Sequence, residues 1–278
     1  MIVGVDIGGS ITKAVLMKRS DIISMTMSKT LEDPLTSLSG VLGKVVSQAS
    51  LQLSDIDCIA VSGGKSRLLP NALFGLSIVK VNEIESIGTG GLTLSKRNHA
   101  LVASLGTGTA IVWARDSGRS VVHVGGTGVG GGTIMGLGRQ LIGIGDVSLL
   151  AQLARTGSPK AVNLTVDDIV GSGVGILNPS VTASNFGRID GSTRREDLAA
   201  GLFSMAGEVI GVVLHLASDS VKENDIVLVG TLSTIQEIAS VVKRTLGYFG
   251  KDAEIPAMSE YCVAVGSAVR LASQRGET

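Results

Sequence analysis

Length, composition and charge narrow the possible classes of protein before any motif is considered. The chain has 278 residues, enough for one large domain or two lobes, and carries 24 basic and 24 acidic side chains. This balance gives no general electrostatic attraction to nucleic acid or to an anionic membrane surface, so we expect neither partner. Glycine occurs 38 times, far above the average usage of about 7%, which indicates backbone that turns tightly or approaches a ligand closely.

The cysteines and the N-terminus bear on the cellular compartment. Cys58 and Cys262 are far apart in the sequence and fit no metal-ligand or redox spacing, so we interpret both as buried thiols in a reducing environment. Asp6 interrupts the first apolar run, which argues against a signal peptide. No window approaches the roughly 18 apolar residues of a membrane span. These features predict a cytoplasmic protein.

Strands and helices alternate in the first part of the chain. The apolar runs 2–5 and 14–16 flank DIGGSITK, which predicts a β-hairpin with polar residues at its tip. Apolar residues recur at helical intervals over residues 38–50, and IDCIAVSGG predicts a buried strand that ends in glycine. The segment IVKVNEIESIGTGGLTL then predicts a strand that leads into a helix.

The opening pattern returns in the second part of the chain, and this repetition predicts two lobes. ALVASLGTGTAIVWA is again an apolar strand, a small polar turn and an apolar strand. Helices are predicted over 133–156 and 197–218, a buried strand in DIVLVGTLS, and a final helix near Gly266. We place the lobe boundary at about 95–100, which gives lobes 1–98 and 99–278, with the final helix able to pack back on the first lobe.

Two glycine turns have the composition of phosphate-binding loops. In DIGGSITK, backbone N–H groups, the hydroxyls of Ser10 and Thr12, and Lys13 could surround a phosphate while Asp6 holds hydrated magnesium; an ordinary hairpin turn fits equally well. SLGTGTA is a second turn of this kind, and the pair could hold one polyphosphate from both sides. Neither turn has the P-loop order, and DIGG leads into a strand where a dinucleotide fingerprint requires a helix.

Two further segments could complete a site. VGGTGVGGGTIMGLG, residues 124–138, combines glycine with a following helix, which suits close approach of an anionic ligand better than a flexible linker. In VNEIES, Glu83 and Glu85 follow a buried strand. Either could accept the proton of an attacking hydroxyl. From the residues alone, an acidic first helical turn is the more ordinary interpretation.

Taken in order, these segments resemble the type II pantothenate kinases of the acetate and sugar kinase, heat-shock chaperone and actin superfamily. The resemblance runs from residue 4 to about 271 and is carried by DIGGSITK, VSGGKSR, VNEIESIGTGG, SLGTGT, VGGTGVGGGTIMGLG, TASNFG, VLVGTLS and YCVAVGSAVRL. It implies an α/β protein with two ribonuclease-H-like lobes, the actin-like ATPase fold, around an interlobe nucleotide cleft. It also implies a homodimer that transfers the γ-phosphoryl group of magnesium ATP to the terminal hydroxyl of pantothenate, in coenzyme A biosynthesis.

The resemblance also implies residue roles. Glu83 would be the catalytic base. Asp6 would be a second catalytic residue, which positions the Mg²⁺ ion. The implied ATP-binding residues are Gly8, Gly9, Ser10, Ile11, Thr12, Lys13, Gly106, Thr107, Gly108, Gly131, Gly132, Thr133, Ile134, Met135, Gly230 and Thr231. The implied substrate-binding residues are His123, Thr109, Ala110, Thr182 and Ala183, the last two in the TASNFG segment that would reach a partner's pantothenate pocket.

Two positions depart from the family pattern, and both lie on the substrate side. His123 stands where family members usually have arginine, and Ala110 where they tend to have serine. Histidine has fewer donors than arginine and is only partly charged near neutral pH. Lys65 and Arg67 could supply the missing positive charge or simply be solvated.

Three hypotheses about function therefore stand. The first is a pantothenate kinase, and the second is a kinase of the same fold for another hydroxylated acceptor, such as pantoate, an amino sugar or a polyol. The third is a non-catalytic protein that senses nucleotide or coenzyme A. Glu83, together with the lack of cysteines placed to hold an iron–sulfur cluster, argues against the third. Inhibition by coenzyme A or acyl-CoA stays open.

Overall fold

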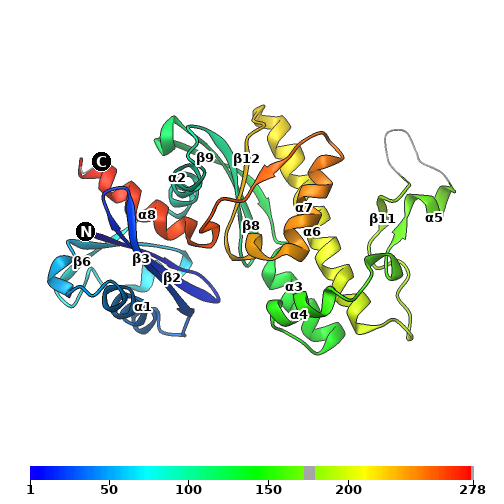
Figure 1. The fold of residues 1–278 in the computed structure, drawn as a ribbon, viewed down its shortest axis with the longest axis horizontal. Coiled ribbons are helices and arrows are strands. Elements are labelled where there is room, and N and C mark those ends of the chain that lie inside the picture. The colour runs from blue at the N-terminus through cyan, green and yellow to red at the C-terminus, as the bar shows by residue number, and fades with distance from the viewer. Residues whose placement is uncertain (172–178, 277–278) are drawn as a thin grey trace.

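Two lobes, each built on a mixed β-sheet, make up the computed structural model, which describes residues 1–171 and 179–276 (Figure 1). The first lobe contains a six-stranded sheet in the order β3-β2-β1-β4-β6-β5. Its strands are β1 (Ile2–Ile7), β2 (Ile11–Lys18), β3 (Asp21–Lys29), β4 (Cys58–Ser62), β5 (Ala72–Leu73) and β6 (Leu76–Lys80). The predicted hairpin is confirmed, because β1 and β2 pair antiparallel around residues 8–10.

The second lobe repeats this arrangement in a five-stranded sheet, in the order β13-β12-β7-β8-β9. Its strands are β7 (Ala100–Leu105), β8 (Thr109–Arg115), β9 (Ser120–Thr127), β12 (Ile226–Val229) and β13 (Ala253–Glu254). In each lobe an antiparallel three-strand meander continues into parallel strands, β1–β4–β6 in the first and β7–β12–β13 in the second. The repetition predicted from the two strand–turn–strand segments is therefore present in the fold.

Helices cover the sheets. Their bounds are α1 (Pro34–Gln48), α2 (Glu83–Ser95), α3 (Gly131–Ile142), α4 (Val147–Ala154), α5 (Val166–Val170), α6 (Arg195–Val221), α7 (Gln236–Gly247) and α8 (Cys262–Gln274). Helix α1 packs on the first sheet, and α3, α4, α6 and α7 build the core of the second lobe. Both cysteines are buried, as expected.

The stretch 133–156, predicted as helical, is two helices. Gly143 ends α3 in the left-handed region, with φ of 81°, and Asp146 caps α4 by accepting bonds from the backbone N–H groups of Ser148 and Leu149. A glycine and an aspartate three residues apart are therefore the signal that breaks this helix.

Helices α2 and α8 are exchanged between the lobes. α2 follows β6 of the first lobe but packs on β7, β8 and β9, whereas α8 follows β13 of the second lobe and packs on β1 and β4. The two helices pack against each other between the sheets (Figure 1). A Cβ on Gly266 would lie 1.8 Å from the Ser86 carbonyl oxygen, so the backbones approach more closely than any other residue would allow. The sequence boundary at residues 98 and 99 stays a prediction.

Helix α6 corrects the expectation that no segment has the length and apolarity of a membrane span. It has 27 residues, and its most apolar 18-residue window has a mean hydropathy of 1.7. Of that window, 61% is buried inside the protein, where Leu202, Phe203, Ile210 and Leu214 belong to the core of the second lobe. The apolar character of α6 is therefore accounted for by packing within the fold.

Candidate functional site

Asp6 and Lys13 form a buried ion pair at the base of the first glycine turn. Asp6 on β1 is paired in register with Lys13 on β2, and Lys13 Nζ lies 3.6 Å from Asp6 Oδ2. Both residues are buried. Burial raises the pKa of Asp6, and the nearby Lys13 charge opposes that rise. The turn thus holds a carboxylate whose charge is supported by one specific ammonium group.

Ser62 adds a polar group that the sequence did not single out. It lies at the end of β4, in register with Asp6 across the parallel pair of strands, and is fully buried. Its Oγ has no hydrogen-bond partner. A buried hydroxyl without a partner is unusual and suggests that a water or ligand oxygen belongs beside it. The signal in the sequence is the serine at the strand end in VSGG.

Glu83 and Glu85 differ in what they contact. Glu85 Oε2 accepts a hydrogen bond from Arg270 Nε at 3.1 Å and is therefore committed to α8. The Glu83 side chain, at the first turn of α2, has no ion pair or hydrogen bond within residues 1–171 and 179–276 and is open to solvent. Desolvation by the surrounding protein, and secondarily the charge of Asp6, raise the pKa of Glu83. Glu83 is thus the carboxylate with capacity to take a proton.

The second glycine turn is tied to the start of α3. Gly131 N–H donates to the Gly106 carbonyl and Gly132 N–H to the Thr107 carbonyl, both at 2.8 Å. A Cβ on Gly130 would lie 2.6 Å from the Thr107 carbonyl oxygen. Some of the glycines in residues 124–138 are therefore needed for the close packing of this segment on the Gly106–Thr107 turn. Residues 124–127 belong to β9, which leaves only 128–130 as a loop.

The two phosphate-type turns approach each other across the lobes. A Cβ on Gly9 would lie 3.5 Å from Thr107 Oγ1, and Gly9, Ser10 and Thr107 are all exposed. Thr12 differs, because it is fully buried and its Oγ1 lies 2.9 Å from Thr30 Oγ1. Its hydroxyl already has a partner, whereas the tip residues are open.

The remaining implied ATP-binding residues lie in the second lobe. Ile134 is fully buried in the core, whereas Met135 is half-buried. Gly230 follows β12 with φ of 92°, and its N–H donates to the Ser259 carbonyl at 2.9 Å. Thr231 begins the short 3-10 helix after it. A Cβ on Gly230 would meet the Leu105 carbonyl at 2.5 Å, which ties this segment to the strand before the second turn.

His123 and Ala110 lie on the face of the second sheet that α2 covers. His123 is paired with Val112, which shares a cluster with Ala110 and residues of α2. His123 itself is exposed, near the middle of edge strand β9, and Ala110 is half-buried. Thr109 is buried, and its Oγ1 donates to the Val129 carbonyl at 2.9 Å. Lys65 Nζ donates to the Leu31 carbonyl, and Arg67 is exposed.

Thr182 and Ala183 lie on a projection remote from Asp6. They belong to β11 (Thr182–Ser184), which pairs with β10 (Leu164–Thr165) beside α5, at the opposite end of the molecule from β2 and β3 (Figure 1). Thr182 Oγ1 donates to Glu208 Oε1 at 2.9 Å, and Asn185 donates to Glu208 Oε2. One chain thus does not bring these two residues to the Asp6 turn.

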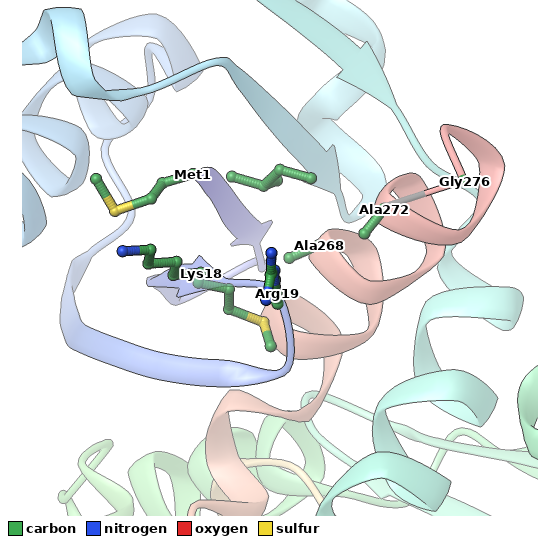
Figure 2. A pocket seen from close by; sticks show the side chains of 8 residues that line it. Met1, Lys18, Arg19, Ala268, Ala272 and Gly276 are labelled. Atoms are coloured by element: carbon green, nitrogen blue, oxygen red, sulfur yellow. The ribbon is translucent and has the colours of Figure 1, made fainter. Parts of the chain in front are cut away.

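A cavity at the outer end of the first lobe is separate from this site. It has a volume of about 550 Å³ and lies between Met1, Lys18, Arg19 and the last turns of α8 (Figure 2). Its wall includes Ile2, at the N-terminal end of β1, whereas Asp6 lies near the C-terminal end of that strand. The candidate site is therefore defined by the two turns and the carboxylates.

Comparisons with known proteins show the family to which the chain belongs. The family model Fumble matches residues 93–269. The chain is 31% identical over 241 residues to a curated protein of Bacillus thuringiensis subsp. konkukian named type II pantothenate kinase, with 82% of each chain covered.

Solved structures share the fold at low identity. The activator of 2-hydroxyisocaproyl-CoA dehydratase from Clostridium difficile, solved with bound ADPNP, has a TM-score of 0.72 at 16% identity, covering 99% of this chain and 96% of that one. A ROK family glucokinase from Streptomyces griseus, in complex with glucose and AMPPNP, has a TM-score of 0.61 at 14% identity, covering 98% and 99%. The expected α/β fold of two actin-like ATPase lobes is confirmed.

Proposed function

Because this chain belongs to the Fumble family of type II pantothenate kinases, we propose that it is an ATP-dependent kinase that phosphorylates the terminal hydroxyl of pantothenate. The observation that carries the proposal is the placement of Glu83. Its carboxylate has no internal partner among the described residues and a raised pKa, and the two open phosphate-type turns lie nearby around Asp6. A raised pKa makes a carboxylate a stronger base, which favours abstraction of a hydroxyl proton.

ATP would lie between the two turns. The exposed tips at Gly9–Ser10 and at Thr107 present backbone donors to the phosphates from opposite sides. Gly131 to Met135, together with Gly230 and Thr231, would line the remainder of the nucleotide. The hydrogen bonds between α3 and the Gly106–Thr107 turn support this part of the proposal, because they hold the turn in place before ligand arrives.

The residues around Asp6 fit a magnesium ion. Mg²⁺ prefers oxygen ligands and is commonly held by one or two carboxylates, substrate phosphates and waters. Asp6 supplies a carboxylate, and the unpartnered Ser62 hydroxyl beside it could bind a coordinated water. When bound, the ion would neutralise charge on the phosphates. Lys13 would favour the ionised form of Asp6, against the rise in its pKa that burial causes.

His123 and Ala110 are the positions that bear on the acceptor. Both lie on the sheet face covered by α2, the helix that begins with Glu83. If His123 contacts the carboxylate of pantothenate, His123→Arg should lower KM for pantothenate about tenfold, because a permanently charged guanidinium donates two bonds to a carboxylate. Initial-rate kinetics at saturating ATP would show this change, and KM for ATP should stay within about twofold. An unchanged KM for pantothenate would separate His123 from the acceptor.

We infer that the active form is a homodimer, in which Thr182 and Ala183 serve the partner's pocket. The distance between the β10–β11 projection and Asp6 within one chain supports this arrangement (Figure 1). We expect Thr182→Val and Glu83→Gln proteins each to be impaired alone, and their mixture to recover about a quarter of wild-type activity. Random exchange makes half the dimers mixed, each with one intact site. No recovery after verified subunit exchange would contradict sharing between subunits.

An acceptor panel tests the proposed function. Purified protein with magnesium ATP should release ADP with pantothenate, and much less with pantoate, amino sugars or polyols. Turnover with one of these alone would favour a kinase for another acceptor, which the departures at His123 and Ala110 motivate. Nucleotide binding without turnover on any acceptor would favour a sensing role. Coenzyme A and acyl-CoA, added to the same assay, test inhibition. We place the protein in the cytoplasm, where these substrates occur.

A further inference from the structure

A second cavity, of about 680 Å³, lies in the second lobe where β8 ends. Its wall includes Asn98, Trp113, Arg115 and Arg119. Strand β8 runs from Thr109, next to the second glycine turn, to Arg115. At about 3.3 Å per residue, the strand separates this cavity from that turn by about 20 Å. The cavity is therefore distinct from the proposed kinase site.

Two guanidinium groups in this cavity lack acidic partners. Among the described residues, no carboxylate oxygen lies within 4.0 Å of Arg115 or Arg119. The Arg115 guanidinium stacks on the Trp113 ring at 4.0 Å from its centre, and its Nη2 donates to Ser120 Oγ at 3.2 Å. Its Nε is buried without a hydrogen-bond partner. The stack holds the orientation of Arg115 and leaves one buried donor unused.

The buried acid of the cavity already has hydrogen-bond partners of its own. Glu223 Oε2 lies 2.8 Å from His99 Nδ1 and accepts from Trp113 Nε1 at 3.3 Å, while its Oε1 accepts from the backbone N–H of Asp225. These bonds lower the pKa of Glu223 against the effect of burial. Asp116, the other acid of the cavity wall, is exposed. The arginines are thus left to an external anion.

The turn after β8 is strained, and it orients a further donor. Asp116 and Ser117 have φ of 53° and 55°, in the left-handed region that residues other than glycine rarely adopt. Ser117 Oγ donates to Asn98 Oδ1 at 3.2 Å, which leaves the donor capacity of the Asn98 amide nitrogen unused by this contact. Strain of this kind collects at ligand sites, where the surrounding structure maintains it.

We propose that this cavity binds a phosphoryl group of a small molecule. The guanidinium groups of Arg115 and Arg119 and the side-chain amide of Asn98, all in the cavity wall, offer separate donors to the three terminal oxygens of such a group. Arginine forms charge-assisted bonds with both phosphoryl and carboxylate ligands. A phosphoryl group fits this cavity better, because a single carboxylate has only two oxygens for the three donors. The site does not depend on the proposed kinase activity.

Trp113 allows a direct test, because it is the single tryptophan of the chain. Full-length protein, saturated with magnesium and a non-hydrolysable ATP analogue to fill the kinase site, is titrated with inorganic pyrophosphate at constant ionic strength and pH. We expect a saturable change in Trp113 fluorescence. Arg119→Gln should weaken pyrophosphate binding about tenfold, as loss of one charge-assisted bond implies. Arg119 is exposed, so this variant should fold normally.

Two controls make the result decisive. Arg275→Gln removes an exposed arginine at the end of α8 and should leave the titration unchanged. Arg115→Lys keeps a charge but loses the guanidinium Nε, and should also weaken binding about tenfold. The proposal is overturned if pyrophosphate gives no saturable change in the wild-type protein, or if Arg119→Gln binds as tightly as wild type. It is also overturned if citrate saturates the signal and pyrophosphate does not.

Discussion

Glu83→Gln should lower kcat for pantothenate phosphorylation about 10²–10⁴-fold, the usual contribution of a positioned general base. KM for ATP should change little, because Glu83 lies at the first turn of α2 and not on either phosphate-type turn. Steady-state kinetics with a continuous ADP-release assay measure both constants. A Glu83→Gln enzyme with full turnover would remove Glu83 from the role of base.

Glu85→Gln is the matched control, because it makes the same chemical change two residues along the same helix. Glu85 pairs with Arg270 at 3.1 Å, and both side chains are partly exposed. Its loss should cost at most about 1 kcal/mol of stability. We expect its kcat to stay within about threefold of wild type, since ordinary surface changes have small effects.

The pH dependence of the wild-type enzyme gives a second view of Glu83. Partial desolvation by the surrounding protein, and secondarily the charge of Asp6, raise its pKa above the ordinary value of 4.5. The base must be deprotonated to accept a proton, so kcat/KM should rise with pH through this raised pKa and fall below it. The acidic limb should therefore lie above pH 4.5. It should be absent from the residual activity of Glu83→Gln.

Gly266→Ala should lower the free energy of unfolding by about 3 kcal/mol. The added methyl group collides with the backbone of α2, which can move away only if the whole helix shifts. The added Cβ would lie 1.8 Å from the Ser86 carbonyl oxygen and 2.8 Å from the Gly90 backbone nitrogen. The contact between α2 and α8 would have to open, and with it the packing between the lobes. Urea denaturation followed by circular dichroism measures the change.

Gly40→Ala provides the control for this prediction, as another glycine inside a helix. Nothing lies within 4 Å of a Cβ placed on Gly40, which is exposed on α1. The substitution should raise the free energy of unfolding by about 0.5–1 kcal/mol, the difference in helix propensity between the two residues. If Gly266→Ala were as stable as wild type, the exchange of α2 and α8 would not be as tightly packed as described.

Local patterns in the sequence were sufficient for the hairpins and most helices. The runs around DIGGSITK and SLGTGTA predict strand–turn–strand units because apolar strands and a glycine turn are short-range features, and both units are present. Strand β3 was not predicted, although the alternation in DIISMTMSK is a usable signal. It is an edge strand with little buried surface.

The packing of α2 and α8 could not be predicted in the same way. Which sheet a helix covers depends on contacts between residues far apart in the chain, such as Gly4 with Ala264 and Gly90 with Cys262. In the sequence, nothing distinguishes Gly4 or Gly90 from the other glycines among the 38 of the chain. The possibility that the final helix returns to the first lobe was part of the two-lobe prediction. The corresponding position of α2 on the second sheet was not anticipated.

In the candidate site, too, short-range features could be predicted from the sequence and long-range contacts could not. The order of motifs was enough to propose Asp6, Glu83 and the two turns, and it follows from strand ends and glycine positions. By itself it did not separate Glu83 from Glu85; the family resemblance made that choice, and the structure adds that Glu85 contacts Arg270. Nor could the order of motifs assign Thr12, whose hydroxyl meets Thr30 on β3. Ser62 is found only through its buried, unpartnered Oγ.

Product identification tests the central claim most directly. Wild-type protein is incubated with magnesium ATP and pantothenate, and the product is analysed by mass spectrometry and by ³¹P–¹H correlated NMR. The account predicts a phosphomonoester on the terminal hydroxyl of pantothenate, formed by wild type and Glu85→Gln but about 10²-fold more slowly or less by Glu83→Gln. A correctly folded protein that binds ATP but forms no phosphopantothenate would contradict it.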